Sequence, residues 1–149
     1  MVSNATAFAG YLYHGWLGDR IGRRNAISIG WVLSAASFVA MLLVAPQGNF
    51  GIIIALYSAG LFFLIGPYSA LLFFNAESFP VHTRATGGAI INACGQVGAA
   101  IGGVLITASL AGGWTWIQST LVWGALPILL SGFILLGARN VDPRTVRTD

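Results

Sequence analysis

The sequence contains no lysine and one cysteine, and charged residues make up only 7% of its 149 residues. Soluble domains carry charge on about a quarter of their residues, so this scarcity excludes an ordinary soluble domain. Disorder is also excluded, because disordered segments combine low hydrophobicity with high charge, whereas 56% of this chain is hydrophobic. The lone Cys94 excludes an internal disulfide and a paired-cysteine metal site. These numbers indicate a membrane protein.

The few charged residues fall into three short clusters separated by long apolar stretches. Residues 25–76 and residues 85–138 carry no charged side chain. Each stretch is long enough for two membrane-spanning helices of about 20 residues with a short turn between them. Turn-forming residues occur where such turns are needed, at 46–49 in the first stretch and at the glycine pair 112–113 in the second. The sequence therefore predicts two helical hairpins.

The predicted fold class is an all-α integral membrane protein with four full transmembrane helices and one partial N-terminal helix. The four full helices are expected near residues 26–45, 51–74, 86–109 and 116–137. Residues 2–18 precede them and would form a helix of about 26 Å, shorter than the roughly 30 Å hydrocarbon core. We accordingly divide the chain into a transmembrane region, residues 1–138, and a polar tail, residues 139–149.

Charge asymmetry predicts the orientation of the chain. All seven arginines lie in the three clusters, and hairpin geometry returns the clusters to one side of the membrane. The positive-inside rule makes that side the cytoplasm, so we expect a multi-pass protein of the plasma or inner membrane whose charged loops and C-terminus are cytoplasmic. The hairpin turns then face outward, where Trp114 and Trp116 either anchor the chain at the interface or pack within the protein.

The first apolar segment is incomplete as a span and does not have the order of a signal peptide. A signal peptide has basic residues before its apolar stretch, whereas here they follow it. Met1 would lie at the edge of the bilayer or within it, so we expect it to be an internal methionine or a misplaced start. The chain is therefore expected to be the C-terminal part of a longer protein.

The loop that follows this segment combines glycine, one acid and three arginines. Residues 15–24 read Gly-Trp-Leu-Gly-Asp-Arg-Ile-Gly-Arg-Arg, which resembles the G-x-L-x-D-R-x-G-R-R loop of the major facilitator superfamily of transporters. The matching glycine and charged positions are Gly15, Asp19, Arg20, Gly22, Arg23 and Arg24. An acid and three arginines in a tight turn can form competing ion pairs and helix-end contacts, which suits a conformational latch. The alternative is an ordinary basic loop that fixes orientation.

A second segment resembles the same family. Residues 77–84 read Glu-Ser-Phe-Pro-Val-His-Thr-Arg, similar to the E-x-x-P-x-x-x-R segment that joins the fourth and fifth helices of a six-helix half. Pro80 is expected to end the preceding helix, because the residue before a proline avoids helical geometry. Thr83 is expected to provide the N-cap of the next helix.

The acid of this second segment has alternative partners. Glu77 can pair with Arg84 in its own segment, or with Arg23 or Arg24 in the first motif. Exposed ion pairs are worth only about 0 to 1 kcal/mol each. Pairs that form in one state and break in the other can nevertheless bias a conformational equilibrium of a few kcal/mol.

The two motifs and their spacing resemble the C-terminal half of a major facilitator, helices 8 to 12, of the metabolite or sugar-porter kind. A sugar porter would carry a P-E-T-K-G-like tail, which residues 140–144 do not match. The resemblance implies a secondary carrier, such as a symporter, that moves a small polar metabolite by alternating access between two halves. Its partners would be the solute, the lipid bilayer and the missing N-terminal half, with no nucleic acid. This chain alone is then expected to be inactive.

The resemblance also places a solute path on three of the predicted helices. The candidate residues are Tyr11, Tyr68, Asn92 and Gln96. Asn92 and Gln96 lie four residues apart on one helix face, where they contact either the solute or a neighbouring helix. Gly98 and Gly102 on the same helix form a small-xxx-small face that favours close helix packing.

Other chemistries find little support in the sequence. Aspartate, glutamate, lysine and arginine are absent from the predicted spans, so a proton-relay carboxylate would have to lie elsewhere. The chain has no Walker sequence for ATP and no cluster of metal ligands, and we expect no cofactor. Two alternatives to a carrier remain: a membrane subunit that packs through its glycine faces, and, less favoured, a lipid-modifying enzyme that uses Asp19.

The size of the native product tests whether this sequence is part of a longer carrier. An antibody against residues 139–149, applied to membranes of the source cells, is expected to detect a species much longer than 149 residues. Detection of a 149-residue product would contradict the expectation that Met1 is not the true start.

Overall fold

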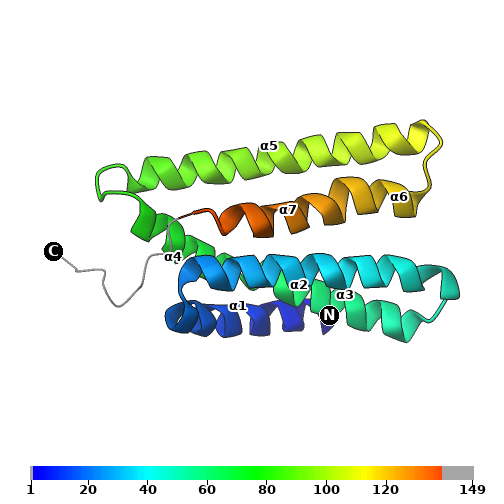
Figure 1. Ribbon diagram of the computed structural model, residues 1–149, viewed down its shortest axis with the longest axis horizontal. Helices are drawn as coiled ribbons and strands as arrows, with labels where there is room; N and C mark the ends of the chain where they lie inside the picture. The colour runs from blue at the N-terminus through cyan, green and yellow to red at the C-terminus, as the bar shows by residue number, and fades with distance from the viewer. Residues whose placement is uncertain (1, 139–149) are drawn as a thin grey trace.

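The computed structural model describes residues 2–138, which fold into α-helices (Figure 1). The helices are Val2–Ile21 (α1), Arg23–Val44 (α2), Phe50–Ile65 (α3), Tyr68–Ser78 (α4), Arg84–Ala111 (α5), Trp116–Thr120 (α6) and Leu126–Leu135 (α7). Four segments are long and apolar enough to cross a membrane: Arg23–Gln47, Phe50–Ser78, Arg84–Ala111 and Trp116–Leu135. The predicted all-helical class with four full spans is therefore confirmed. The predicted tail lies outside the described residues.

Both predicted hairpin turns are present, and both use glycine at a left-handed position. A short 3₁₀ turn, Ala45–Gln47, ends at Gly48, whose φ of 72° other residues rarely adopt. Asn49 then caps α3, because its side chain accepts a hydrogen bond from the Ile52 amide at 3.3 Å. In the second hairpin Gly113 has a φ of 87°.

The predicted second span is broken near its middle. Pro67 has no amide hydrogen, so the carbonyl of Phe63 loses the donor that a continuous helix would supply. The helix ends at Ile65 and restarts at Tyr68, and Ser69 donates its amide to Gly66 O at 3.2 Å across the break. The kink places α3 against α1 and α2 and directs α4 towards the end of the molecule where α5 begins (Figure 1).

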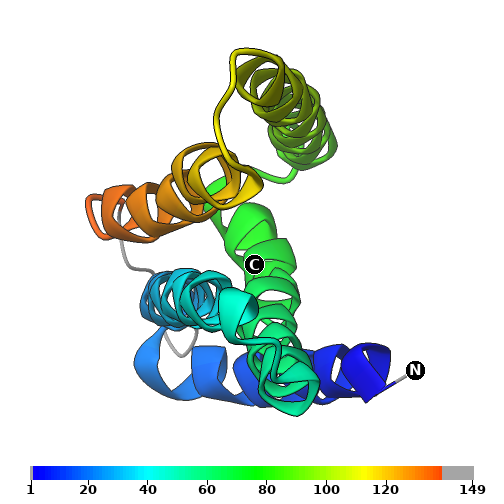
Figure 2. The same cartoon turned by 90° about the vertical axis from the view of Figure 1, so that its right-hand side faces the viewer.

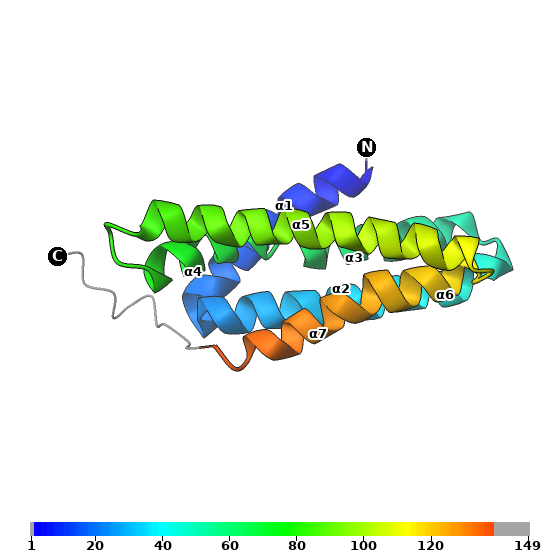
Figure 3. The same cartoon turned by 90° about the horizontal axis from the view of Figure 1, so that it is seen from above.

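Helix α2 is the centre of the fold. It packs against α1, α3, α4 and α7, and Figure 3 shows α1 crossing at an angle to α2 and α7. Close approach depends on small residues and on hydroxyl groups that bind the neighbouring backbone. Ser34 donates to Gly60 O of α3 at 3.0 Å, and Ser28 donates to Gly132 O of α7. Such interhelical hydrogen bonds stabilise helix pairs that lack a hydrophobic driving force in lipid.

Helix α5 stands apart from this centre (Figure 2). It contacts α4 near its start and α6 with the following turn near its end, and none of its residues is buried within the described chain. The packing predicted for its glycine face is not formed here: a Cβ on Gly98 would meet nothing within 4 Å, and one on Gly102 only the Trp123 carbonyl at 3.9 Å.

The last span bends where α6 meets α7. Residues Leu121–Ala125 form a π-helical turn, an arrangement that widens the helix by one residue and bends it. Pro127 follows in the first turn of α7, and because α7 continues directly from the π-helical turn, its missing amide hydrogen leaves a carbonyl of that turn without a helical donor. The bend lets α6 stay beside α5 while α7 packs on α2.

Glycine packing around α2 gives a stability prediction. Gly30 touches the break in the second span, so a Cβ there would overlap Pro67 and lie 3.1 Å from Phe63 O. Gly30→Ala should lower the free energy of unfolding by about 1 to 3 kcal/mol. Gly103→Ala, where a Cβ would meet nothing within 4 Å, should be neutral or raise it by up to about 1 kcal/mol. Denaturation in detergent micelles, followed by circular dichroism, measures both. Equal changes in the free energy of unfolding for Gly30→Ala and Gly103→Ala would contradict the close contact between Gly30 and Pro67.

Candidate functional site

The first candidate site is a charged junction where the ends of α1, α2 and α4 meet. We define it as Gly15, Asp19, Arg23, Phe73 and Glu77. Arg23, the first residue of α2, has a side chain only 8% exposed. Its Nη2 lies 2.6 Å from Asp19 Oδ1 and its Nε lies 3.6 Å from Glu77 Oε1.

Two further contacts complete the surroundings of this guanidinium. Nη1 of Arg23 donates to the carbonyl of Gly15 at 3.4 Å. The guanidinium carbon lies 4.7 Å from the ring centroid of Phe73, within the range of a cation–π interaction. One side chain thus binds α1 twice and α4 twice.

The electrostatics of the junction depend on Arg23. The Glu77 side chain is only 15% exposed, and a buried carboxylate without a counter-charge is strongly unfavourable. Asp19 is 62% exposed, so water already screens it. Both acids lie near the N-terminus of α2, where the helix dipole favours negative charge. Of the three arginines predicted as possible partners of Glu77, the structure pairs it with Arg23. Arg84 forms no ion pair with any residue from 2 to 138.

The other two arginines of the first motif act outside the junction. Arg20 is exposed on the surface and lies over the Trp16 ring, 4.5 Å from its centroid. Arg24 donates from Nη1 to the carbonyls of Leu136 at 3.1 Å and Ala138 at 2.9 Å. These carbonyls follow the end of α7, so Arg24 satisfies acceptors left free at a helix C-terminus. Arg23 therefore contacts α1 and α4, whereas the adjacent Arg24 contacts the end of α7.

The second motif connects α4 to α5 as predicted, with one correction. Phe79, before Pro80, is extended at φ −116° and ψ 142°, which ends α4. Thr83 occupies the N-cap position of α5, but its side chain makes no capping bond. Its hydroxyl donates instead to the carbonyl of Pro80 at 3.3 Å, so it closes the loop. Gly22 separates α1 from α2 with a φ of 88°, in accordance with the predicted tight turn.

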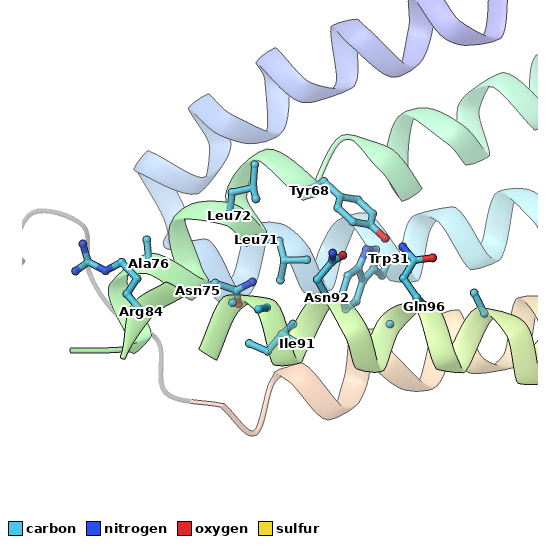
Figure 4. Close-up of a pocket in the computed structure, with 14 residues that line it drawn as sticks. Trp31, Tyr68, Leu71, Leu72, Asn75, Ala76, Arg84, Ile91, Asn92 and Gln96 are labelled. Atoms are coloured by element: carbon cyan, nitrogen blue, oxygen red, sulfur yellow. The ribbon is translucent and has the colours of Figure 1, made fainter. Parts of the chain in front are cut away.

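The second candidate site is a cavity of about 760 Å³ between α2, α4 and α5 (Figure 4). Its lining includes three of the four predicted path residues, Tyr68, Asn92 and Gln96. Figure 4 shows these side chains facing the same space from opposite walls. Arg84 lines the other end of the cavity, beside Ala76. The fourth, Tyr11, is exposed on α1 and does not line this cavity, so its place on a solute path stays a prediction.

Sequence reasoning missed Trp31, which lines the cavity from α2. Its Nε1 is buried and has no hydrogen-bond partner among the described residues. Pattern alone offered one signal, since an indole N–H in the middle of an apolar span needs an acceptor. The cavity face of α2 was not expected, because the family resemblance pointed to the other helices. Asn75, from α4, was also missed, because it lies one residue beyond the predicted span of 51–74.

The described part of the chain contains no group of three or more histidine, cysteine, aspartate or glutamate side chains that can hold a metal ion. The model of the Major Facilitator Superfamily matches residues 1–148. Among curated proteins, none matches the sequence significantly. The match covers nearly the whole chain, so the protein belongs to the major facilitator superfamily. Members of this family are secondary transporters, and the chain is a multi-pass membrane protein with transmembrane helices.

The junction predicts a sharp contrast between two arginines. Arg23→Leu leaves the Glu77 carboxylate buried without a counter-charge, so the free energy of unfolding should fall by about 3 to 5 kcal/mol. Arg20→Leu removes an exposed guanidinium from Trp16, and the change should stay within about 1 kcal/mol. Denaturation of the two variants in lipid nanodiscs gives the comparison. A loss for Arg23→Leu no larger than that for Arg20→Leu would show that the junction does not hold the helices.

Proposed function

We propose that this chain forms the C-terminal half, helices 8 to 12, of a secondary carrier that moves a small polar metabolite. The spacing of the two motifs supports this register, because the first joins α1 to α2 and the second joins α4 to α5. The carrier works by alternating access, in which two halves rock around a central site. The second half is an N-terminal bundle, and this chain is inactive without it.

The buried position of Arg23 is the observation that carries the proposal. It binds α1 through Asp19 and Gly15, and α4 through Glu77. The Arg23–Glu77 contact at 3.6 Å is longer than a close ion pair, whereas the Arg23–Asp19 contact at 2.6 Å is tight. Arg23 can therefore release α4 while it keeps α1, which makes Glu77 the separable partner. We infer that this release is the latch step of the cycle.

The cavity supports the transport part of the proposal. Residues at both ends of α4 take part, since Tyr68 lines the cavity and Glu77 belongs to the junction. Movement of α4 therefore changes the cavity and the latch together. In the proposed orientation the junction, Arg84 and the tail are on the cytoplasmic side, so the cavity opens towards the cytoplasm when α4 is released.

A packing subunit is the alternative that the structure gives a reason to keep. The Gly98–Gly102 face of α5 is uncovered in the described chain, because a Cβ at Gly98 would meet nothing within 4 Å and one at Gly102 only the Trp123 carbonyl at 3.9 Å. Such a face suits contact with another helix. A packing subunit has no need of a latch, so its behaviour should not depend on Glu77. An enzyme is not favoured, because Asp19 and Glu77 are both bound to Arg23.

Cysteine accessibility tests the latch. Cys94→Ala removes the one native thiol, and Ala89→Cys then places a reporter on the cavity wall. Glu77→Gln weakens the hold of Arg23 on α4, which opens the cavity in the proposed cycle. It should therefore raise the rate at which the reporter thiol reacts with a membrane-impermeant thiosulfonate about fivefold, equivalent to about 1 kcal/mol in the opening equilibrium.

Arg20→Gln is the matched control, since it also removes one charge from a motif but lies outside the junction. It should leave the rate unchanged. If the thiol reaction rate is the same with Glu77→Gln as with Glu77 intact, the result would favour the packing subunit over the carrier.

A further inference from the structure

Helix α2 and the last span lie close together at one end of their contact and separate towards the other. Ser28 of α2 donates to Gly132 O of α7, and a Cβ on Gly132 would lie 2.9 Å from the Val32 side chain. Towards the hairpin turns the last span bends at its π-helical turn, Leu121–Ala125, and α6 contacts α5. A groove of about 440 Å³ therefore opens between α2, the π-helical turn and the start of α7.

The groove has an aliphatic lining. Among the described residues, only valine, alanine and leucine line it. Its floor includes Ala35 and Ala125, which are 2% and 4% exposed, and its open side includes the exposed Ala36 and Leu126. Atoms that border an unfilled space lack van der Waals partners, and water finds no hydrogen-bond partners among such side chains. The groove therefore favours an apolar occupant.

The groove faces away from the cavity between α2, α4 and α5. A second space of about 320 Å³ shares Trp31 with that cavity and is lined by Pro127 and Ile128 of α7. Leu126 and Leu129 of the same helix line the groove. Residues two positions apart on a helix point about 200° away from each other, so the two pairs lie on opposite faces of α7. A second half that closes around the cavity leaves the groove open to the lipid bilayer.

The groove continues to the end of the spans. Leu121 and Val122 also line a space of about 530 Å³ at the turn between α5 and α6. Gly113, Trp114 and Gln118 complete its lining, and Figure 1 shows this turn at the same end of the molecule as the turn between α2 and α3. Indole groups are suited to the boundary between lipid and water. An apolar path inside the membrane thus leads to a more polar space at its surface.

The depth of this path is close to that of one bilayer leaflet. Val32, at the inner end, lies 12 residues before Val44, the last residue of α2, and therefore about 18 Å from it along the axis. Half of the roughly 30 Å hydrocarbon core is about 15 Å. A second helix fits less well, because a helix about 10 Å wide would need roughly 800 Å³ over the distance from Val32 to Val39.

The surface end of the path carries no charge. Residues 45–49 and 112–116, which form the two hairpin turns, include no aspartate, glutamate, lysine or arginine. Selection of an anionic headgroup depends on clustered basic residues, and the arginines of this chain lie beyond the opposite ends of the spans. Binding here would therefore depend on the acyl chain and not on the charge of the headgroup.

We propose that the groove between α2, the π-helical turn and α7 binds one acyl chain of a membrane phospholipid, whose headgroup lies beside Trp114 and Gln118. The lipid belongs to the leaflet on the side of the hairpin turns, which is the outer leaflet in the proposed orientation. Its chain fills the space that opens at the bend in the last span and joins that span to the central helix. The site is separate from the cavity and does not depend on which solute is carried.

Retention of lipid by the purified 149-residue chain tests this proposal. The chain is reconstituted in nanodiscs of phosphatidylcholine, transferred to a mild detergent, washed free of bulk lipid and examined by native mass spectrometry. Lipids that only surround the protein exchange into the detergent, whereas a chain packed in the groove is retained. One phosphatidylcholine should stay with each protein molecule, and phosphatidylglycerol should be retained equally well. Loss of all lipid, or retention of phosphatidylglycerol alone, would overturn the proposal.

A pair of alanine substitutions locates the retained lipid. Ala36 is exposed on the open side of the groove, so the ring of Ala36→Phe takes the place of the acyl chain without entering the protein core. Ala55 is exposed on α3 and does not line the groove, which makes Ala55→Phe the matched control. Ala36→Phe should lower the ratio of lipid-bound to lipid-free protein about tenfold, and Ala55→Phe should leave it unchanged. Equal ratios for the two variants would place the lipid elsewhere and overturn the site.

A measurement on the unmodified chain does not depend on how the variants fold. Phosphatidylcholine with a photoactivatable diazirine in its acyl chain is bound in the same way, and its crosslinks are mapped by peptide mass spectrometry. The crosslinks should concentrate on residues 32–39 and 121–129. An even distribution over the four spans would contradict a specific site. A mass of two protein copies that falls to one copy with Ala36→Phe would show that a second chain covers the groove, and would also overturn the proposal.

Discussion

The fold depends on one buried guanidinium. Arg23 begins the central helix, and its charge must be balanced where the side chain is only 8% exposed. Asp19 from α1 and Glu77 from α4 supply that balance, and Phe73 covers the guanidinium. Because a buried charge is tolerated only with its partners in place, the ends of three helices are held in one arrangement. The neighbouring Arg24 adds the end of α7.

This constraint has consequences for the cavity. The second span changes direction at Pro67, and the junction holds the far end of α4 beside α2. The kink carries Tyr68 to the cavity wall opposite Asn92 and Gln96. Helix α5 contacts α4 at one end and α6 at the other. The cavity lies between α5, α4 and α2. The charged junction and the cavity between α2, α4 and α5 are thus connected by a single short helix, α4.

Much of the fold could be predicted from the sequence. Charge-free stretches fixed the four spans, and glycine at positions 48 and 113 marked the turns, because these signals are local. The motifs also indicated the charged residues of the junction. Which acid pairs with which arginine could not be predicted, since Glu77 and Arg84 are close in sequence while Arg23 is close in space. Trp31 was missed because its place in the cavity depends on how α2, α4 and α5 pack.

A double-mutant cycle between Arg23 and Glu77 tests the central claim most directly. The free energy of unfolding in nanodiscs is measured for Arg23→Leu, Glu77→Leu and the double variant, with a parallel cycle between Arg20 and Glu77. If the guanidinium and the carboxylate stabilise each other, the double variant should be more stable than the sum of the single losses predicts, by about 1 to 3 kcal/mol, and the Arg20 cycle should be additive. Additive losses in the Arg23 cycle would contradict the account.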